Sequence, residues 1–331
     1  MTQITVDADS AQVRLDRILR KRLALKSLAE IYRLIRTGAV KVNGRKRKEN
    51  YRLKEGDVIT VPLPGAEVVD RQSFDDSIAK LANTDYFRKN FNLIFEDEHI
   101  LVCNKPANVV VHSGTGHARK NTLIDLAAAY MAKSNRKGKR SEPALVHRLD
   151  KDTSGVILIA KDKQTLRYLH SILRERDIDK QYIALCHGLP EKKKGVIEAA
   201  LVRNHEFESG TKVKVSSQGQ KSRSIYKVTD FRNGVSRLEI KLETGRTHQI
   251  RVHLAHIGCP IIGDSRYGDA SRDAALFDDS TIHKTLYLHA YQIGFFYPYL
   301  QRDICFSAPE PESFSRLWKY LCGPVARIEQ L

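Results

Sequence analysis

The sequence predicts an α+β protein in two parts, a small basic module followed by a larger domain. Three observations support this prediction. The length of 331 residues favours two domains over one. Hydrophobic residues make up 41% of the chain, which is enough for ordinary cores. Apolar residues recur with helical spacing in some stretches and alternate in others, and residues 196–245 are β-rich.

The charge of the chain points to a polyanionic partner. The net charge is +17, and residues 1–63 carry 15 Lys and Arg against 7 Asp and Glu, so +8 of the total lies there. An excess of this size is typical of proteins that bind nucleic acid. The alternative is a basic surface that serves only solubility.

The cysteines and the N-terminus bear on the compartment. Five cysteines are scattered singly without a CxxC pair, so neither a disulfide framework nor a Cys-rich zinc site is predicted. The first residues, MTQITVDADS, are polar and acidic, unlike a signal peptide, and no apolar run has the length of a membrane span. We therefore expect a soluble cytoplasmic protein with no membrane partner.

The basic module begins with two predicted helices. Apolar residues have helical spacing over 15–23 and again over 28–35. Ser27 and Glu30 have the S-x-x-E spacing of a capping box at the start of the second helix, and Gly38 suits its end.

Two strands are predicted to complete the module. Residues 40–42 and Val58–Val61 have strand patterns, and Asn43-Gly44 is a turn signal. Cations off the apolar faces are free to meet phosphate. The candidates for RNA contacts in this module are Arg33, Arg36, Arg45, Lys46 and Arg47. For the last three, a solvated basic hairpin is the alternative.

The module has a recognisable pattern as a whole. RLDRILRKRL…IYRLIRTGAVKVNGRKRKENYRLKEGDVITV resembles an S4-type RNA-binding domain along its whole length. The resemblance implies that residues 1–63 form a small α/β domain that presents two helices to structured RNA. Residues 64–90 contain prolines and mixed charges and predict a linker, with a short helix around Ser77–Ala82.

The larger domain, predicted over 91–331, contains a polar loop that leads into a buried strand. The loop is Val146–Gly155, VHRLDKDTSG, and Val156–Ala160 is the apolar run that follows it. Such a loop is a usual support for a catalytic group. The alternative is a tight turn in which Asp150 or Asp152 caps backbone amides and Gly155 has a positive φ.

Other elements of this domain follow from the same rules. Asp162 and Thr247 are predicted N-caps of two helices, the second with the sequence HQIRVHLAHIG, in which His248 and Arg251 share a face. Lys133–Glu142 predicts an exposed basic loop, either an RNA contact or a disordered insert. Strands are also predicted at Ile100–Cys103, Ile183–Cys186, 238–242 and Leu286–Phe296, and helices at 121–130, with Asn121 as cap, and at Phe314–Leu321.

Three segments together carry a second resemblance. VHRLDKDTSG, KQYIAL and TGRTHQIRVHLAHIGCPIIGDSRYG closely resemble the RluA-type pseudouridine synthases, and the chain is most similar to the RluC branch, which modifies large-subunit ribosomal RNA. The resemblance implies a catalytic domain with a mixed, mainly antiparallel sheet flanked by helices and loops. It also implies isomerisation of uridine in RNA without a cofactor.

The resemblance assigns roles to individual residues. Asp150 is the essential carboxylate, and attack on ribose C1′, attack on uracil C6 and removal of the C2′ proton all stay open for it. Arg251 pairs with that carboxylate and lowers its pKa. Tyr182 packs on the target base, and Arg148 helps to expel the flipped nucleotide. As alternatives, Tyr182 is a core residue and Arg251 a structural partner.

The remaining candidates concern RNA and metal. Further RNA contacts are predicted at His147, Arg246 and His248, although a capping role at the helix start is an alternative for the last two. His253, His256 and Cys259 are spaced by three, which spreads them around a helix, so no metal site is expected.

We therefore expect a monomeric pseudouridine synthase whose partner is large-subunit ribosomal RNA or its assembly intermediate. Alternatives are a ribosome-assembly factor that retains only the scaffold, a synthase acting on another RNA such as tRNA, and glycosidase-like hydrolysis.

Overall fold

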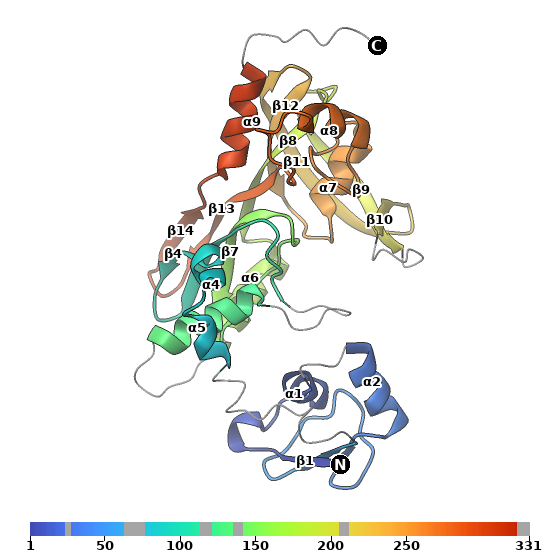
Figure 1. The fold of residues 1–331 in the computed structure, drawn as a ribbon, viewed down its shortest axis with the longest axis vertical. Coiled ribbons are helices and arrows are strands. Elements are labelled where there is room, and N and C mark those ends of the chain that lie inside the picture. The colour runs from blue at the N-terminus through green and yellow to red at the C-terminus, as the bar shows by residue number, and fades with distance from the viewer. Residues whose placement is uncertain (24–27, 63–76, 113–120, 135–141, 205–211, 323–331) are drawn as a thin grey trace. The chain divides into compact units, whose positions relative to one another are not determined.

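The computed structural model describes six stretches of the chain, residues 1–23, 28–62, 77–112, 121–134, 142–204 and 212–322 (Figure 1). The predicted capping residue Ser27, much of the predicted linker and most of the loop Lys133–Glu142 lie outside these residues. The chain divides into two compact units, one of Met1–Lys89 with Val110–Arg140 and one of Asn90–Val109 with Ser141–Leu331.

The N-terminal residues form a small sheet with two helices. The strands β1 (Thr2–Thr5), β3 (Val58–Val61) and β2 (Lys41–Val42) are antiparallel in that order, and α1 (Leu15–Arg22) and α2 (Leu28–Thr37) accompany them. Buried residues between 4 and 61 make one core, so the module encloses its own apolar side chains. The predicted helices and strands are confirmed. Strand β1 was missed because TQIT contains a single apolar residue.

The same unit includes further helices. Residues 77–81 are helical, as predicted around Ser77–Ala82, and α4 (Asp85–Asn90) follows. Helix α5 (Leu123–Ser134) begins one residue later than its predicted cap Asn121 suggests. The hydroxyl of Thr122 donates to the Asp125 carboxylate at 2.8 Å, and that carboxylate also accepts from the Thr122 amide at 3.0 Å. The prediction of Asn121 as cap is therefore wrong, because Thr122 and Asp125 fill that role.

Eleven strands form one sheet in the described part of the second unit. Their order is β10-β9-β11-β12-β8-β13-β7-β5-β4, with β14 paired to β13 and β6 to β7. All pairs are antiparallel except β13 with β7, so the predicted mixed, mainly antiparallel sheet is confirmed. The strands are β4 (Asn92–Glu96), β5 (Ile100–Lys105), β6 (Ala144–Leu145), β7 (Ser154–Ala160), β8 (Asp179–His187), β9 (Lys194–Asn204), β10 (Lys212–Val215), β11 (Gln220–Arg232), β12 (Val235–Leu242), β13 (Leu288–Tyr297) and β14 (Arg302–Ser307).

In the described part of this unit, four helices accompany the sheet, namely α6 (Lys163–Glu175), α7 (Gln249–His256), α8 (Ala270–Phe277) and α9 (Glu312–Cys322). Asp162 caps α6 as predicted, because its carboxylate accepts from the Thr165 amide at 2.8 Å. Helix α8 was not predicted. None of its residues is buried, so its sequence lacks the apolar stripe that marks a helix.

Strand β7 lies inside the sheet between β13 and β5, and all its residues are buried. It pairs in parallel with β13 through only two registered pairs, Ser154 with His289 and Gly155 with Ala290. Gly155 has a φ of 118°, and a Cβ there would lie 2.1 Å from the carbonyl oxygen of Ala290. Only glycine fits this close approach of the two backbones. The positive φ that the sequence suggested for Gly155 is also present.

Within the described ranges, no helix is both long enough and apolar enough to cross a membrane.

Candidate active site

The polar loop that precedes β7 is fastened to that strand by His147. The Leu158 amide donates to Nε2 of His147 at 3.1 Å. Burial, together with the charge of Lys180, lowers the pKa of His147 to about 3, so its ring is neutral and can accept this bond. The sequence predicted an RNA contact for His147 and missed this structural bond.

A buried lysine, Lys105, also binds the backbone of this loop through hydrogen bonds. Lys105 is fully buried, and its Nζ donates to the carbonyl oxygens of Pro106 at 2.8 Å, Val109 at 3.0 Å and Lys151 at 2.8 Å. Burial lowers the pKa of Lys105 to about 7, although the charges of nearby aspartates oppose this shift. Because Lys151 directly follows Asp150, Lys105 fixes the backbone beside the candidate carboxylate.

Helix α7 begins in an unusual way. His248 occupies the N-cap position with a φ of 53° and no side-chain capping bond. The predicted N-cap Thr247 is wrong, because its hydroxyl instead accepts from Nη2 of Arg203 at 2.8 Å. The side-chain oxygen of Gln249 accepts from the Arg246 amide at 3.0 Å, which ties the turn before the helix to the first helical residue. A left-handed residue other than glycine costs about 1–3 kcal/mol and is typical of functional sites.

Buried hydrogen bonds tie α7 to β11. The side-chain Nε2 of Gln249 donates to the Ser224 hydroxyl at 3.0 Å. His253, with no exposed surface, bonds Ser224 through Nδ1 at 3.0 Å and Ser222 through Nε2 at 2.8 Å. Both ring nitrogens of His253 are thereby occupied, and no group of three potential metal-ligating side chains exists among the residues the structure describes.

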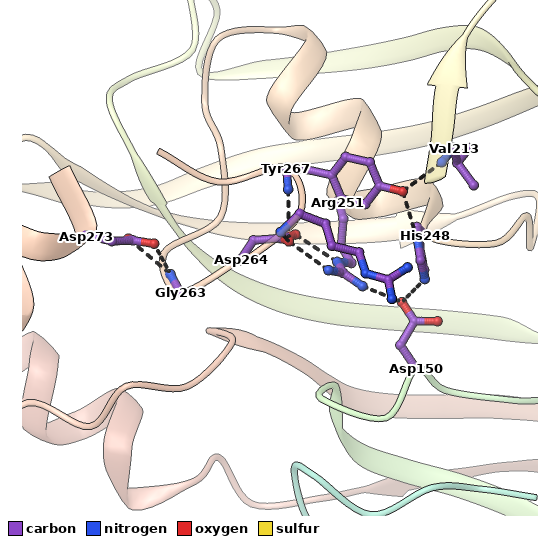
Figure 2. A network of polar contacts seen from close by, with 9 residues as sticks. Asp150, Val213, His248, Arg251, Gly263, Asp264, Tyr267 and Asp273 are labelled. Atoms are coloured by element: carbon purple, nitrogen blue, oxygen red, sulfur yellow. Dashed lines mark hydrogen bonds and ion pairs between the residues drawn. The ribbon is translucent and has the colours of Figure 1, made fainter. Parts of the chain in front are cut away.

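Arg251 of α7 lies between two carboxylates (Figure 2). Its Nε and Nη2 each donate to Asp264 at 2.7 Å, and its Nη1 donates to Asp150 at 3.3 Å. The side chain of Asp264 has no exposed area and that of Arg251 has 5%, whereas Asp150 keeps 20%. Burial opposes the charge of Arg251, but Asp264 and Asp150 outweigh it and raise the pKa of the guanidinium. Asp264 therefore fixes the position of Arg251, whereas Asp150 stays accessible from the cavity.

A second chain of contacts reaches Asp150 through His248 (Figure 2). The Val213 amide donates to the Tyr267 hydroxyl at 2.9 Å, and that hydroxyl lies 2.8 Å from Nδ1 of His248. Nε2 of His248 lies 3.8 Å from Asp150. Burial, with the charge of Arg251, lowers the pKa of His248, although Asp150 opposes the shift. The left-handed backbone of His248 is what directs its ring to this position.

Tyr182 reaches the same site from β8. Its side chain is 7% exposed. Burial, together with the negative charge of Asp150, raises the pKa of the phenol well above its ordinary value. Tyr182 therefore stays protonated at neutral pH and offers a ring face and a hydroxyl donor.

Asp150, Tyr182, His248 and Arg251 line one cavity of about 590 Å³. Its cationic lining exceeds its anionic lining, which consists of Asp150 and Glu243. The lining contains two histidines, His147 and His248. Its arginine and lysine side chains are Arg148, Arg174, Arg176, Lys180, Arg203, Arg246 and Arg251. A site of this charge suits a polyanion that presents a neutral base to Asp150.

The structure brings most sequence-predicted site residues together. The cavity is lined by Asp150, Tyr182, Arg251, Arg148, His147, Arg246 and His248. The predicted contacts in the N-terminal module belong to the other compact unit. There Arg33 and Arg36 are exposed on α2, Arg45 and Lys46 are also exposed, and Arg47 stacks on Tyr51 with its guanidinium 4.7 Å from the ring centre.

Four residues of the site were missed by sequence reasoning. Asp264 and Tyr267 stand in the quoted segment CPIIGDSRYG. An aspartate that follows an apolar run and a glycine is the signal that could have revealed a buried partner. Lys180 precedes Tyr182 by two residues and therefore shares its face of β8. Lys105 bonds only carbonyl oxygens, and such bonds leave no sequence pattern.

Comparisons with known proteins agree on one family. The model of the RNA pseudouridylate synthase family matches residues 99–256, and that of the S4 domain matches residues 13–59. Proteins named ribosomal large subunit pseudouridine synthase C are similar along nearly the whole chain. The one from Escherichia coli K12 is 34% identical over 314 residues, 95% of this chain and 94% of that protein. The one from Haemophilus ducreyi is 35% identical over 306 residues, 92% of this chain and 91% of that protein.

A solved structure supports the same assignment. The human protein titled RNA Pseudouridylate Synthase Domain Containing 4 matches with a TM-score of 0.58 and 25% identity, over 75% of this chain and 97% of that one. Sequence, fold and site geometry thus agree. The chain therefore belongs to the RNA pseudouridylate synthase family, whose members isomerise uridine in RNA, and it carries an S4 domain near its N-terminus.

Proposed function

We propose that this enzyme converts specific uridines of large-subunit ribosomal RNA to pseudouridine, with Asp150 as the essential carboxylate and without a cofactor. The names of its relatives support this RNA as the substrate. The observation that carries the catalytic assignment is the position of Asp150. It is the accessible carboxylate of a buried Asp–Arg–Asp cluster, in a cavity lined mainly by cations.

Arg251 prepares Asp150 for chemistry. The guanidinium donates to the carboxylate at 3.3 Å, which orients the carboxylate and restricts its rotamer. An ionised Asp150 has three routes to the uridine: attack on ribose C1′, attack on uracil C6, or removal of the C2′ proton. In each route the bond between N1 and C1′ breaks, the uracil turns within the cavity, and C5 bonds to C1′. The proton on C5 then leaves, N1 gains a proton, and Asp150 gives up the bond or the proton that it had taken.

In this proposal Tyr182 binds the flipped base, and Arg148 occupies the place that the base leaves in the RNA. A protonated, buried Tyr182 offers its ring to the flipped uracil and its hydroxyl to one of the uracil's polar atoms. Arg148 is exposed and lines the cavity, which suits a residue that fills the gap left in the RNA by the flipped nucleotide. Arg246 and His248 are proposed contacts to the RNA near the target.

The N-terminal module supplies affinity in this proposal. Residues 1–63 act as the RNA-binding domain, 64–90 as the linker and 91–331 as the catalytic domain. Arg33, Arg36, Arg45 and Lys46 are exposed cations available to phosphate. We also infer that the enzyme works as a monomer in the cytoplasm, where bacteria assemble their ribosomes.

The experiment is incubation of unmodified large-subunit ribosomal RNA with the wild type or with Asp150→Ala. Carbodiimide treatment followed by primer extension gives stops at pseudouridine. We expect new stops with the wild type and none with Asp150→Ala, while both proteins bind the RNA with similar affinity. The stops also name the modified uridines.

Other outcomes would overturn this proposal. Release of free uracil would indicate hydrolysis. Stops that appear only with transfer RNA would change the substrate. Tight binding without stops on either naked RNA or assembling particles would indicate a binding protein that retains only the scaffold.

A further inference from the structure

Lys180 lines the cavity, but beyond its effect on the pKa of His147 it has so far been given no role. It stands two residues before Tyr182 on β8, so both side chains lie on the same face of that strand. Its backbone is paired with Ile293 of the central strand β13. Lys180 is partly buried, whereas Tyr182 is 7% exposed, so the lysine lies nearer the cavity mouth.

Within the described residues, the ammonium of Lys180 has no counter-charge. Among the described residues, no carboxylate lies within 4.0 Å of its Nζ. The neighbouring Asp179 is already engaged, because Lys241 lies 2.8 Å from one of its oxygens and Gln181 donates to the other at 2.8 Å. Burial alone lowers the pKa of Lys180, which is the effect of desolvation without an opposing partner.

The surroundings of Lys180 leave room for an anion. A Cβ on Gly245 would lie 3.6 Å from Nζ, so the absent side chain leaves that space open. His147, which the charge of Lys180 influences, is neutral and points its Nε2 at β7. An unpaired, desolvated ammonium beside bare backbone and a neutral ring is a site prepared for an external negative charge.

We propose that Lys180 binds a backbone phosphate of the RNA next to the target uridine and thereby sets the depth to which the nucleotide enters the cavity. This inference rests on the proposed function. Two strand residues span about 7 Å, so a base against Tyr182 has a phosphate of its own or a neighbouring nucleotide within reach of Lys180. A phosphate, as the only full negative charge on RNA, offsets the desolvation of an ammonium better than a uracil carbonyl.

The test compares Lys180→Met with Lys180→Arg and with Lys227→Met as matched control. Lys227 is exposed on β11 and is absent from the cavity lining. The probe is a transcript of large-subunit ribosomal RNA that contains a uridine modified by the wild type. Affinity is measured against salt concentration, and conversion is followed in single-turnover reactions.

Loss of one phosphate contact lowers the slope of log affinity against log salt by about 0.7–0.9. Lys180→Met should therefore bind about five- to eightfold more weakly at 0.1 M salt than the wild type and converge with it near 1 M. Lys180→Arg should keep the slope, because it keeps the charge. Thermal denaturation should show that all variants fold like the wild type.

Two results would overturn the inference. An unchanged slope for Lys180→Met, with or without slower conversion, would mean that Lys180 meets the base or only the protein. An equal loss with Lys227→Met would mean that any surface cation acts alike. Failure of the proposed function is distinguishable, because the wild type itself would then convert no uridine.

Discussion

At the scale of single residues, one aspartate fixes the position of Arg251, and a different aspartate is accessible for the reaction. Asp264 forms two bonds of 2.7 Å with Arg251 and is fully buried, whereas Asp150 forms one of 3.3 Å and keeps access to the cavity. A guanidinium with two donors on one carboxylate is fixed in direction. The remaining donor can then position Asp150 without enclosing it.

Asp264→Ala should be strongly destabilising. Removing one partner of a buried pair leaves an uncompensated charge and typically costs about 3–5 kcal/mol in the free energy of unfolding. Urea denaturation measures this loss. Asp85→Ala is the control, because its pair with Arg88 is exposed on α4 and should contribute nothing measurable. Similar losses in both variants would contradict the holding role of Asp264.

Lys105 predicts a pH dependence of stability. The pKa of Lys105 is about 7 in the folded protein and about 10.4 in an unfolded chain. Below pH 7 both states hold the proton, and the folded state carries the full cost of the buried charge. Between these two pKa values the unfolded state binds more protons, so stability rises with pH by up to about 1.4 kcal/mol per unit.

The measurement for Lys105 is the difference in unfolding free energy between the wild type and Lys105→Met from pH 6 to pH 9. We expect the unfolding free energy of the wild type to rise relative to that of Lys105→Met as the pH rises above 7. A difference that stays flat over this range would show that Lys105 keeps its proton in the folded state.

Part of the site could be predicted from the residue types in the sequence, and the rest could not. Asp150, Tyr182 and Arg251 stand in motifs whose chemistry is visible in the sequence. Asp264 meets Arg251 across 13 positions and a change of element, a contact that depends on the fold rather than on spacing. Lys105 meets the carbonyl oxygen of Lys151 across 46 positions, and every residue has such an oxygen.

At the scale of elements, local rules predicted some helix boundaries correctly and failed at others. Asp162 caps α6 and Gly38 ends α2 with a φ of 77°, as predicted. The rule failed at α7, because Thr247 has the right residue type but Arg203 uses its hydroxyl. Tertiary partners thus override a local preference that the sequence states correctly.

Gly155→Ala should disrupt the junction of β7 with β13. The φ of 118° alone costs an alanine about 1–3 kcal/mol, and the clash with Ala290 adds to that cost because two central strands must separate. Gly234→Ala is the matched control, since its φ is 76° and nothing lies within 4 Å of the added Cβ. Chemical denaturation of both variants should show a markedly larger loss at Gly155. Equal losses would mean that the strands tolerate the clash.

At the scale of the molecule, binding and chemistry are assigned to different parts of the chain. Deletion of residues 1–63 should weaken RNA affinity and flatten its salt dependence, because exposed cations such as Arg33 and Arg36 are removed. Conversion of a small RNA substrate that depends on Asp150 should persist. Binding across a salt series tests the first part, and single-turnover conversion tests the second. Unchanged affinity after the deletion would contradict the role of the module.

The place of β13 in the sheet has a consequence for biosynthesis. This strand joins β8 to β7, yet it is encoded at residues 288–297, whereas the N-terminal core closes within residues 4–61. At about 5–20 residues per second, roughly 10–50 s of translation separate the two. A nascent chain can therefore display a finished RNA-binding module while its catalytic sheet still lacks the central strand. Newly made copies acquire the means to hold RNA before they acquire the means to modify it.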